Sequence, residues 1–147
     1  QLAKITLDIA KSYNIEKILL NGNIFLAKKL GFDGVHLQST QYTNIKDAKK
    51  YNLFTIISCH TFEDIKQAQT LDANMVTFSP IFDTPNKGEP QGIKVLNNMI
   101  NEFDIPIIAL GGIVTKWHIE QLEKYSIKAY ASIRYFVNEY DKIQNID

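Results

Sequence analysis

The sequence predicts an α/β fold built as a parallel (β/α)₈ TIM barrel. Apolar segments of strand type alternate six times with helical segments, at a period of roughly 20 to 30 residues that is typical of βα units around a parallel sheet. A doubly wound sheet and a (β/α) barrel both fit this alternation. Candidate functional residues follow many of the strands, which favours the barrel because a barrel brings all such strand ends to one face. Six strands are two fewer than eight. We therefore expect residues 1–147 to form a single domain, the C-terminal three-quarters of a barrel whose first two strands are missing from this chain.

The elements in the first half of the chain follow from periodicity and from helix-ending residues. Leu2, Ile5 and Ile9 recur at helical spacing and predict a helix that ends near Asn14. Gly31 is expected to end the second helix, because glycine readily adopts the left-handed conformation found at helix C-termini. Brief apolar and β-branched runs predict the strands between the helices. The remaining elements predicted here are strand 18–20, helix 24–30, strand 34–37, a lysine-rich helix 45–51 and strand 54–58.

The second half continues the same alternation. Thr61 is placed to cap a helix over residues 61–71, with Asp64 as its acidic capping partner three residues later. Thr115 is placed in the same way before a helix over residues 115–125. The tail is expected to begin as a short helix and then to fray. The other elements predicted in this half are strand 75–78, helix 93–103, strand 107–110 and strand 129–133.

Composition restricts the functional class. The chain has 147 residues, of which 45% are hydrophobic, and its 16 basic and 16 acidic side chains cancel. The chain has no run of basic residues, so we do not expect a nucleic-acid partner. No apolar run approaches the roughly 18 residues of a membrane span, and no signal peptide is recognisable. The single cysteine, Cys59, excludes an internal disulfide and fits a reducing compartment. We therefore expect a cytoplasmic protein without a membrane partner, and we leave open whether it forms a homo-oligomer.

Two segments carry residues suited to binding phosphate. The predicted strand at 75–78 leads into a loop of about a dozen residues rich in Pro, Gly, Asp and Lys, longer than most loops of α/β units. Thr84 and Lys87 in this loop offer a hydroxyl and an ammonium to phosphate oxygens. The strand at 107–110 ends in Gly111 and Gly112, which allow backbone N–H groups to approach a phosphate closely. Together the two segments predict a phosphorylated small molecule as ligand.

The motifs that surround these segments resemble the thiamine phosphate synthase / TenI family over nearly the whole chain. The family's Pro-x-Phe-x-Thr-x-x-Lys loop is intact at residues 80–87, and the motifs occur together and in order. The segments that carry the resemblance are LLNG at 19–22, FDGVHL at 32–37, ISCHTFEDIKQA at 57–68, FSPIFDTPNKGEPQG at 78–92 and IPIIALGGI at 105–113.

The resemblance implies a barrel that binds a thiazole phosphate at its glycine-rich strand ends. The synthase of this family joins that ligand to a pyrimidine diphosphate with the help of Mg²⁺ and releases pyrophosphate. The resemblance assigns a binding role to several residues of this chain: Asn21 for the diphosphate, Ser58 near the pyrimidine, Thr84 and Lys87 for phosphate oxygens, and Gly112, next to Gly111, for the thiazole phosphate. Arg134 stands where the family usually has a small residue, and we expect its guanidinium to bind the phosphate together with the backbone donors of Gly111 and Gly112.

The chain departs from the family pattern at the metal-binding positions. Gly22 and Gln41 stand where the synthase has its two acidic metal ligands. Mg²⁺ relies on carboxylate and phosphate oxygens, so we predict no metal site, with Mg²⁺ as cofactor only if synthase activity is retained. The sister branch, TenI, is associated with tautomerising the thiazole carboxylate phosphate, and one of its forms has its catalytic histidine where this chain has Pro80. Neither catalytic pattern is complete in this chain. Because the acidic metal ligands of the synthase are absent, we predict a TenI-like protein. The alternatives are a thiamine-phosphate synthase, a non-catalytic phosphate-ligand-binding or regulatory barrel, and another phosphate-binding barrel such as an indole-glycerol-phosphate enzyme.

The three histidines and the cysteine complete the list of candidates. His60 follows a predicted strand end and is the candidate general acid or base, because imidazole titrates near neutrality. Its alternative role is structural, beside the next helix. His36 is interpreted as a satisfied residue of the barrel interior, and His118 as a surface residue of a helix. Cys59 is expected to be a buried, inert thiol.

Overall fold

A computed structural model describes residues 1–125, 127 and 129–144 of the chain. Its six strands form one parallel sheet in the order β1-β2-β3-β4-β5-β6. The strands are β1 (Leu19–Asn21), β2 (Gly34–Leu37), β3 (Phe54–Cys59), β4 (Met75–Phe78), β5 (Ile107–Leu110) and β6 (Tyr130–Ala131). The helices are α1 (Leu2–Ser12), α2 (Ile24–Leu30), α3 (Asn44–Lys50), α4 (Phe62–Thr70), α5 (Gly92–Glu102), α6 (Lys116–Glu123) and α7 (Arg134–Gln144).

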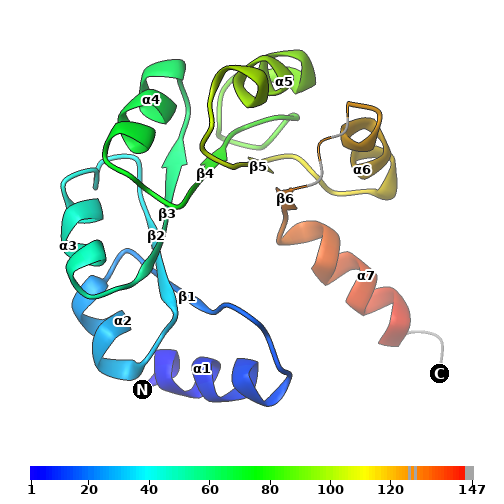
Figure 1. Ribbon diagram of the computed structural model, residues 1–147. Helices are drawn as coiled ribbons and strands as arrows, with labels where there is room; N and C mark the ends of the chain where they lie inside the picture. The colour runs from blue at the N-terminus through cyan, green and yellow to red at the C-terminus, as the bar shows by residue number, and fades with distance from the viewer. Residues whose placement is uncertain (126, 128, 145–147) are drawn as a thin grey trace.

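The sheet is curved, with its strands on the inside and helices α2 to α6 around the outside (Figure 1). An opening separates α1 and β1 from β6 and α7, so the described strands form an open half-barrel (Figure 1). The prediction of six parallel strands with all their C-terminal ends on one side is therefore confirmed. Closure into eight strands remains a prediction.

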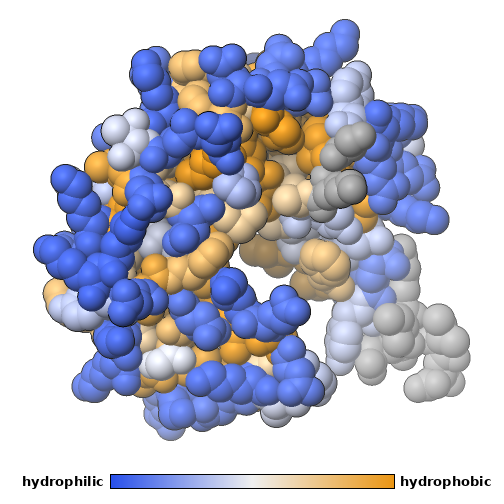
Figure 2. Space-filling view, in the orientation of Figure 1, coloured by the Kyte–Doolittle hydropathy of each residue, from blue (hydrophilic) through white to orange (hydrophobic). Residues whose placement is uncertain are grey.

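The two faces of the sheet differ in burial because successive strand residues point to opposite sides. In β3, Thr55, Ile57 and Cys59 are buried in the core under the helices. Phe54, Ile56 and Ser58 alternate with them and are only half-buried, since they face the concave side. Figure 2 shows hydrophobic surface along this inner side of the curve, bordered by hydrophilic residues on the outer helices.

Helix ends follow the predicted capping residues in two places. Gly31 ends α2 in the left-handed conformation, with φ of 80°. Thr61 and Asp64 form the predicted capping box at the start of α4, in which each side chain accepts a hydrogen bond from the other residue's backbone N–H. Among helices in the described part of the chain, none has the length and apolar composition needed to cross a membrane.

Two expectations for the C-terminal third need correction. Thr115 lies at the N-cap position of α6, but its hydroxyl makes no capping bond. Instead its Oγ1 lies 2.8 Å from Nδ1 of His118. The tail forms an 11-residue helix, α7, which is longer than the short helix expected. Residues 145–147, where fraying was expected, lie outside the described residues.

Lysines near the ends of three successive helices join neighbouring βα units at the N-terminal ends of the strands. Each donates its ammonium to a backbone carbonyl just after the next helix along the chain. The bonds run from Lys11 to Gly31 at 3.3 Å, from Lys28 to Tyr51 at 3.4 Å and from Lys49 to Asp72 at 3.4 Å. Their repetition gives these exposed lysines a structural role, although each bond is worth little by itself.

Candidate functional site

The loop after β4 folds back onto the end of β5. A cis peptide bond joins Ser79 to Pro80, and the chain then turns toward the neighbouring strand. The backbone N–H of Ile81 donates to the carbonyl of Leu110 at 3.0 Å, and that of Phe82 donates to Gly111 at 3.1 Å. The two segments that sequence analysis selected separately therefore form one hydrogen-bonded unit.

The glycines at the end of β5 make this close approach possible. Gly111 and Gly112 have φ of 94° and 71°, a conformation that L side chains rarely adopt. A Cβ atom at Gly112 would lie 2.6 Å from the carbonyl oxygen of Asp83 and 2.6 Å from the carbonyl carbon of Phe82. A Cβ atom at Gly111 would lie 2.8 Å from Cα of Pro80. Any side chain at either position would push the loop away from the strand.

A pocket of about 370 Å³ opens between this loop, the glycine turn and the end of β6. Its polar side chains include Thr84, Lys87 and Arg134, and its glycines are Gly111 and Gly112. The apolar residues that complete the wall are Pro80, Leu110, Ile113, Ala131 and Ile133. Two cations, a hydroxyl and an apolar wall suit a phosphate group attached to an apolar body.

Ser132 fixes one side of this pocket, and sequence analysis did not select it. Its hydroxyl donates to the carbonyl of Ile113 at 2.6 Å and accepts from the backbone N–H of Tyr135 at 3.1 Å. The residue therefore ties the β5–α6 connection to the first turn of α7, where Arg134 lies. A serine near the end of the last predicted strand, just before a helix, is the sequence signal that could have identified it.

The predicted binding residues divide into two groups. Thr84, Lys87, Gly111, Gly112 and Arg134 line the same pocket. Asn21 and Ser58 lie near the C-terminal ends of β1 and β3, toward the same end of the sheet but outside that pocket's lining.

Ser58 is paired with His36 on the concave face. Nε2 of His36 lies 3.1 Å from Oγ of Ser58, on the adjacent strand. Burial lowers the pKa of His36 below its usual value, so its imidazole is neutral at neutral pH. The expectation that His36 is a satisfied interior residue agrees with this contact, but sequence analysis missed its partner.

His60 connects the ends of β3 and β4. Its Nδ1 lies 2.9 Å from the carbonyl oxygen of Ser79, and its backbone N–H donates to the carboxylate of Asp64 at 2.9 Å. Because a carbonyl oxygen can only accept, Nδ1 carries the proton and Nε2 of the neutral ring is an acceptor. His60 therefore has both the predicted place beside the capped helix and a ring nitrogen suited to act as a base.

His118 differs from its sequence-based interpretation as a surface residue. The ring is half-buried and makes a T-shaped contact with the Phe82 ring, at a centroid distance of 4.6 Å. Burial and, to a smaller extent, the charge of Arg134 lower its pKa, while the contact with Thr115 acts in the opposite direction. The residue therefore helps to hold the β4–α5 loop against α6.

The metal-ligand positions of the synthase pattern lie side by side in this chain. A Cβ atom on Gly22 would lie 3.5 Å from Oε1 of Gln41. The Gln41 amide donates to the carbonyl of Gly22 at 3.3 Å and accepts from the backbone N–H of Gln38 at 2.9 Å. Neither position supplies a carboxylate, and the described residues hold no group of three His, Cys, Asp or Glu that could hold a metal ion. These residues do not fit Mg²⁺.

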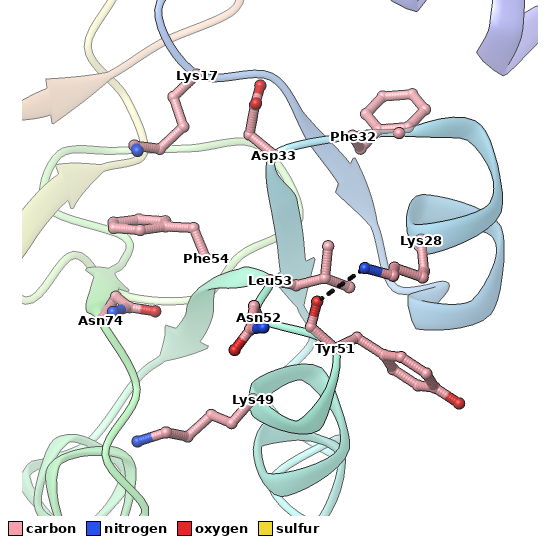
Figure 3. A pocket seen from close by; sticks show the side chains of 11 residues that line it. Lys17, Lys28, Phe32, Asp33, Lys49, Tyr51, Asn52, Leu53, Phe54 and Asn74 are labelled. Carbon is pink, nitrogen blue, oxygen red and sulfur yellow. Dashed lines mark hydrogen bonds between the residues drawn. The ribbon is translucent and has the colours of Figure 1, made fainter.

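A second cavity, of about 670 Å³, lies at the opposite ends of the strands (Figure 3). Its basic residues are Lys17, Lys28 and Lys49. Lys17 lies over the ring of Phe54, 4.6 Å from the centroid, and the other two belong to the lysine bonds between βα units. The loops before the strands of a barrel usually serve stability, and these contacts favour that role here.

Comparison with known proteins gives consistent matches. Residues 1–136 match the family model TMP-TENI, described as thiamine monophosphate synthase. A thiamine-phosphate synthase of Dictyoglomus thermophilum is 30% identical, with 99% of this chain and 68% of that protein covered. One from Dictyoglomus turgidum is 29% identical, with 95% and 65% covered.

The fold comparison agrees with these matches. The structure of thiamine phosphate pyrophosphorylase from Pyrococcus furiosus superposes with a TM-score of 0.76 at 22% identity, with 90% of this chain and 64% of that protein covered. At this identity the match supports the fold. The chain spans about two thirds of the length of these relatives.

Proposed function

Because the chain belongs to the thiamine monophosphate synthase family, we propose that it binds a thiazole phosphate in the pocket between the β4–α5 loop and the end of β6. The observation that carries this proposal is the meeting of Lys87, Arg134 and the Gly111-Gly112 turn in one pocket. Two cations provide charge-assisted hydrogen bonds to a phosphate, and the apolar wall accommodates the carbon skeleton of the ligand.

The proposed reaction is tautomerisation of a thiazole carboxylate phosphate, as in the TenI branch. Gly22 and Gln41 cannot supply the carboxylates that would bind Mg²⁺ beside a diphosphate. A tautomerisation needs a positioned acid or base and no leaving group. His60, whose Nε2 is free to accept a proton in the neutral ring, is the candidate base.

Thiamine-phosphate synthesis is the second candidate, and it is favoured by the name of the curated relatives. In this case a pyrimidine diphosphate would be the second substrate, near Asn21 and Ser58. A third candidate is a regulatory barrel that binds the thiazole phosphate without converting it. These three candidates differ in what they predict for turnover, but all of them require the phosphate pocket.

The phosphate pocket is tested by calorimetry of thiazole phosphate binding to the wild type and to Lys87→Met and Arg134→Gln. Each variant should bind at least about tenfold more weakly, because hydrogen bonds to charged groups contribute about 1.5–3 kcal/mol. Lys66→Met, which removes an exposed lysine on α4 away from the pocket, is the matched control and should bind like the wild type. Equal affinity in all four proteins would place the ligand elsewhere.

Turnover assays separate the three candidates. Thiazole tautomerisation that falls in His60→Asn supports the TenI-like reaction. Robust thiamine phosphate formation that depends on Mg²⁺ would show the synthase reaction instead. Binding without either reaction would identify a regulatory protein.

A further inference from the structure

The concave face carries a row of polar side chains outside the phosphate pocket. His36 on β2 and Ser58 on β3 contact each other through Nε2 and Oγ, 3.1 Å apart. Thr77 on β4 lies directly beside Ser58 in the register of the sheet. Its hydroxyl oxygen is buried and has no hydrogen-bond partner among the described residues.

This row differs from a purely structural network. A buried hydroxyl without a partner costs free energy, so a network that served stability alone would be expected to satisfy it. His36 and Ser58 are only half-buried, and they lie on the face of the sheet that the helices do not cover. Both residues are therefore partly exposed on the side where a ligand would lie.

The row of polar side chains lies close enough to the phosphate pocket for one ligand to reach both. Thr77 is two residues before Ser79, which lines that pocket. Neighbouring strands are about 4.8 Å apart, so Ser58 on β3 lies about 10 Å across the sheet from the end of β5. A heterocycle joined to a phosphate by a short carbon chain can extend across this distance.

We propose that His36 and Ser58 form a proton-transfer pair for the heterocycle of the ligand whose phosphate occupies the pocket. The inference rests on the proposed thiazole phosphate binding and extends it to a second group of residues. His60, the other candidate base, lies at the end of β3 and is bound to Ser79. The pair on the concave face supplies a proton carrier at a different point along the ligand.

The proton balance of this step closes within the protein and the ligand. The Ser58 oxygen takes a proton from a C–H group of the heterocycle while its own hydroxyl proton passes to Nε2 of His36. The electron pair left on the ligand shifts the position of a ring double bond. The protons held by Ser58 and the imidazolium exchange with water, and the pair then returns one proton through Ser58 to a different atom of the ligand, which restores the protein and needs no oxidant or reductant.

The test measures binding and proton exchange separately in the full chain. Thiazole carboxylate phosphate is incubated with the protein in D₂O, and deuterium incorporation is followed by NMR while affinity is measured by calorimetry. Ser58→Ala and His36→Gln should bind the ligand within about threefold of wild type, since the phosphate pocket is intact. Their exchange rates should fall by about 100-fold or more, the usual contribution of a general acid or base.

Thr55→Val is the matched control, because it removes a hydroxyl from the opposite, helix-covered face of β3. It should bind and exchange like the wild type. Wild-type exchange rates in Ser58→Ala and His36→Gln, with binding intact, would overturn the proton-transfer pair and leave the phosphate pocket in place. Loss of exchange in His60→Asn would overturn the pair only together with wild-type exchange in Ser58→Ala and His36→Gln, because proton transfer would then rest on His60. Failure of the wild type to bind would refute the phosphate pocket itself, and with it this inference.

Discussion

Replacement of Gly112 by alanine should cost much more stability than the same replacement at Gly31. Both glycines have positive φ, 71° and 80°, but a Cβ atom at Gly31 meets nothing within 4 Å. At Gly112 it would lie 2.6 Å from three atoms of the β4–α5 loop, two of them in the backbone. The pair therefore separates the cost of the backbone conformation from the cost of displacing the loop.

The expected magnitudes follow from these contacts. An L residue in the left-handed conformation costs about 1–2 kcal/mol, offset by about 0.4–1 kcal/mol from the less flexible unfolded chain. Gly31→Ala should therefore lower the free energy of unfolding by about 1 kcal/mol. Gly112→Ala adds an overpacking cost of about 1–3 kcal/mol, for a total of about 2–4 kcal/mol. Urea denaturation of both variants and the wild type measures the two values directly.

The same variants also test the pocket. Displacing the loop moves Thr84 and Lys87 away from the glycine turn, so Gly112→Ala should weaken thiazole phosphate binding, whereas Gly31→Ala should not. Equal losses of stability in the two variants, within the error of the extrapolation, would refute the close approach of the loop to β5. Unchanged binding in Gly112→Ala would remove the turn from the ligand site.

Three further predictions concern other parts of the chain. Burial raises the pKa of the Cys59 thiol to about 12, so iodoacetamide should label Cys59 in urea-unfolded protein much faster than in native protein; equal rates would contradict its burial. Burial alone would raise the pKa of Asp64, but hydrogen bonds from His60 and Thr61 hold it below its usual value. The stability that this carboxylate contributes is present above the unfolded pKa of about 3.9 and is lost as pH falls through the lower folded pKa. The urea midpoint of the wild type should therefore exceed that of Asp64→Asn by less in acid than at neutral pH. A difference that does not change with pH would contradict this role of Asp64. The double variant Gly22→Asp/Gln41→Asp places two carboxylates side by side, so calorimetry should show Mg²⁺ binding to this variant and not to the wild type. Tight Mg²⁺ binding by the wild type would show that other ligands replace these carboxylates.

Local sequence signals were sufficient to predict the order and type of the elements. Each strand is a short apolar or β-branched run, and the ends of α2 and α4 are fixed by Gly31 and Thr61, which act within a few residues of the chain. The pairing of glycines with a Thr/Lys loop after adjacent strands likewise predicted which segments would meet, because parallel strands place their C-terminal ends on one side. The boundaries were less predictable, and α7 is longer than its mixed composition suggested.

Side-chain partnerships across strands depended on tertiary structure. Ser58 and His36 are 22 residues apart, and their contact depends on the register between β2 and β3, which no local pattern specifies. The contact of Gln41 with Gly22 depends in the same way on how a loop after β2 folds over the end of β1. A shift of one residue in a strand would turn every side chain to the other face. The sequence by itself thus determined the elements and the candidate phosphate residues. The packing of the curved sheet decided that Asn21 and Ser58 lie outside the phosphate pocket and that His36 contacts Ser58.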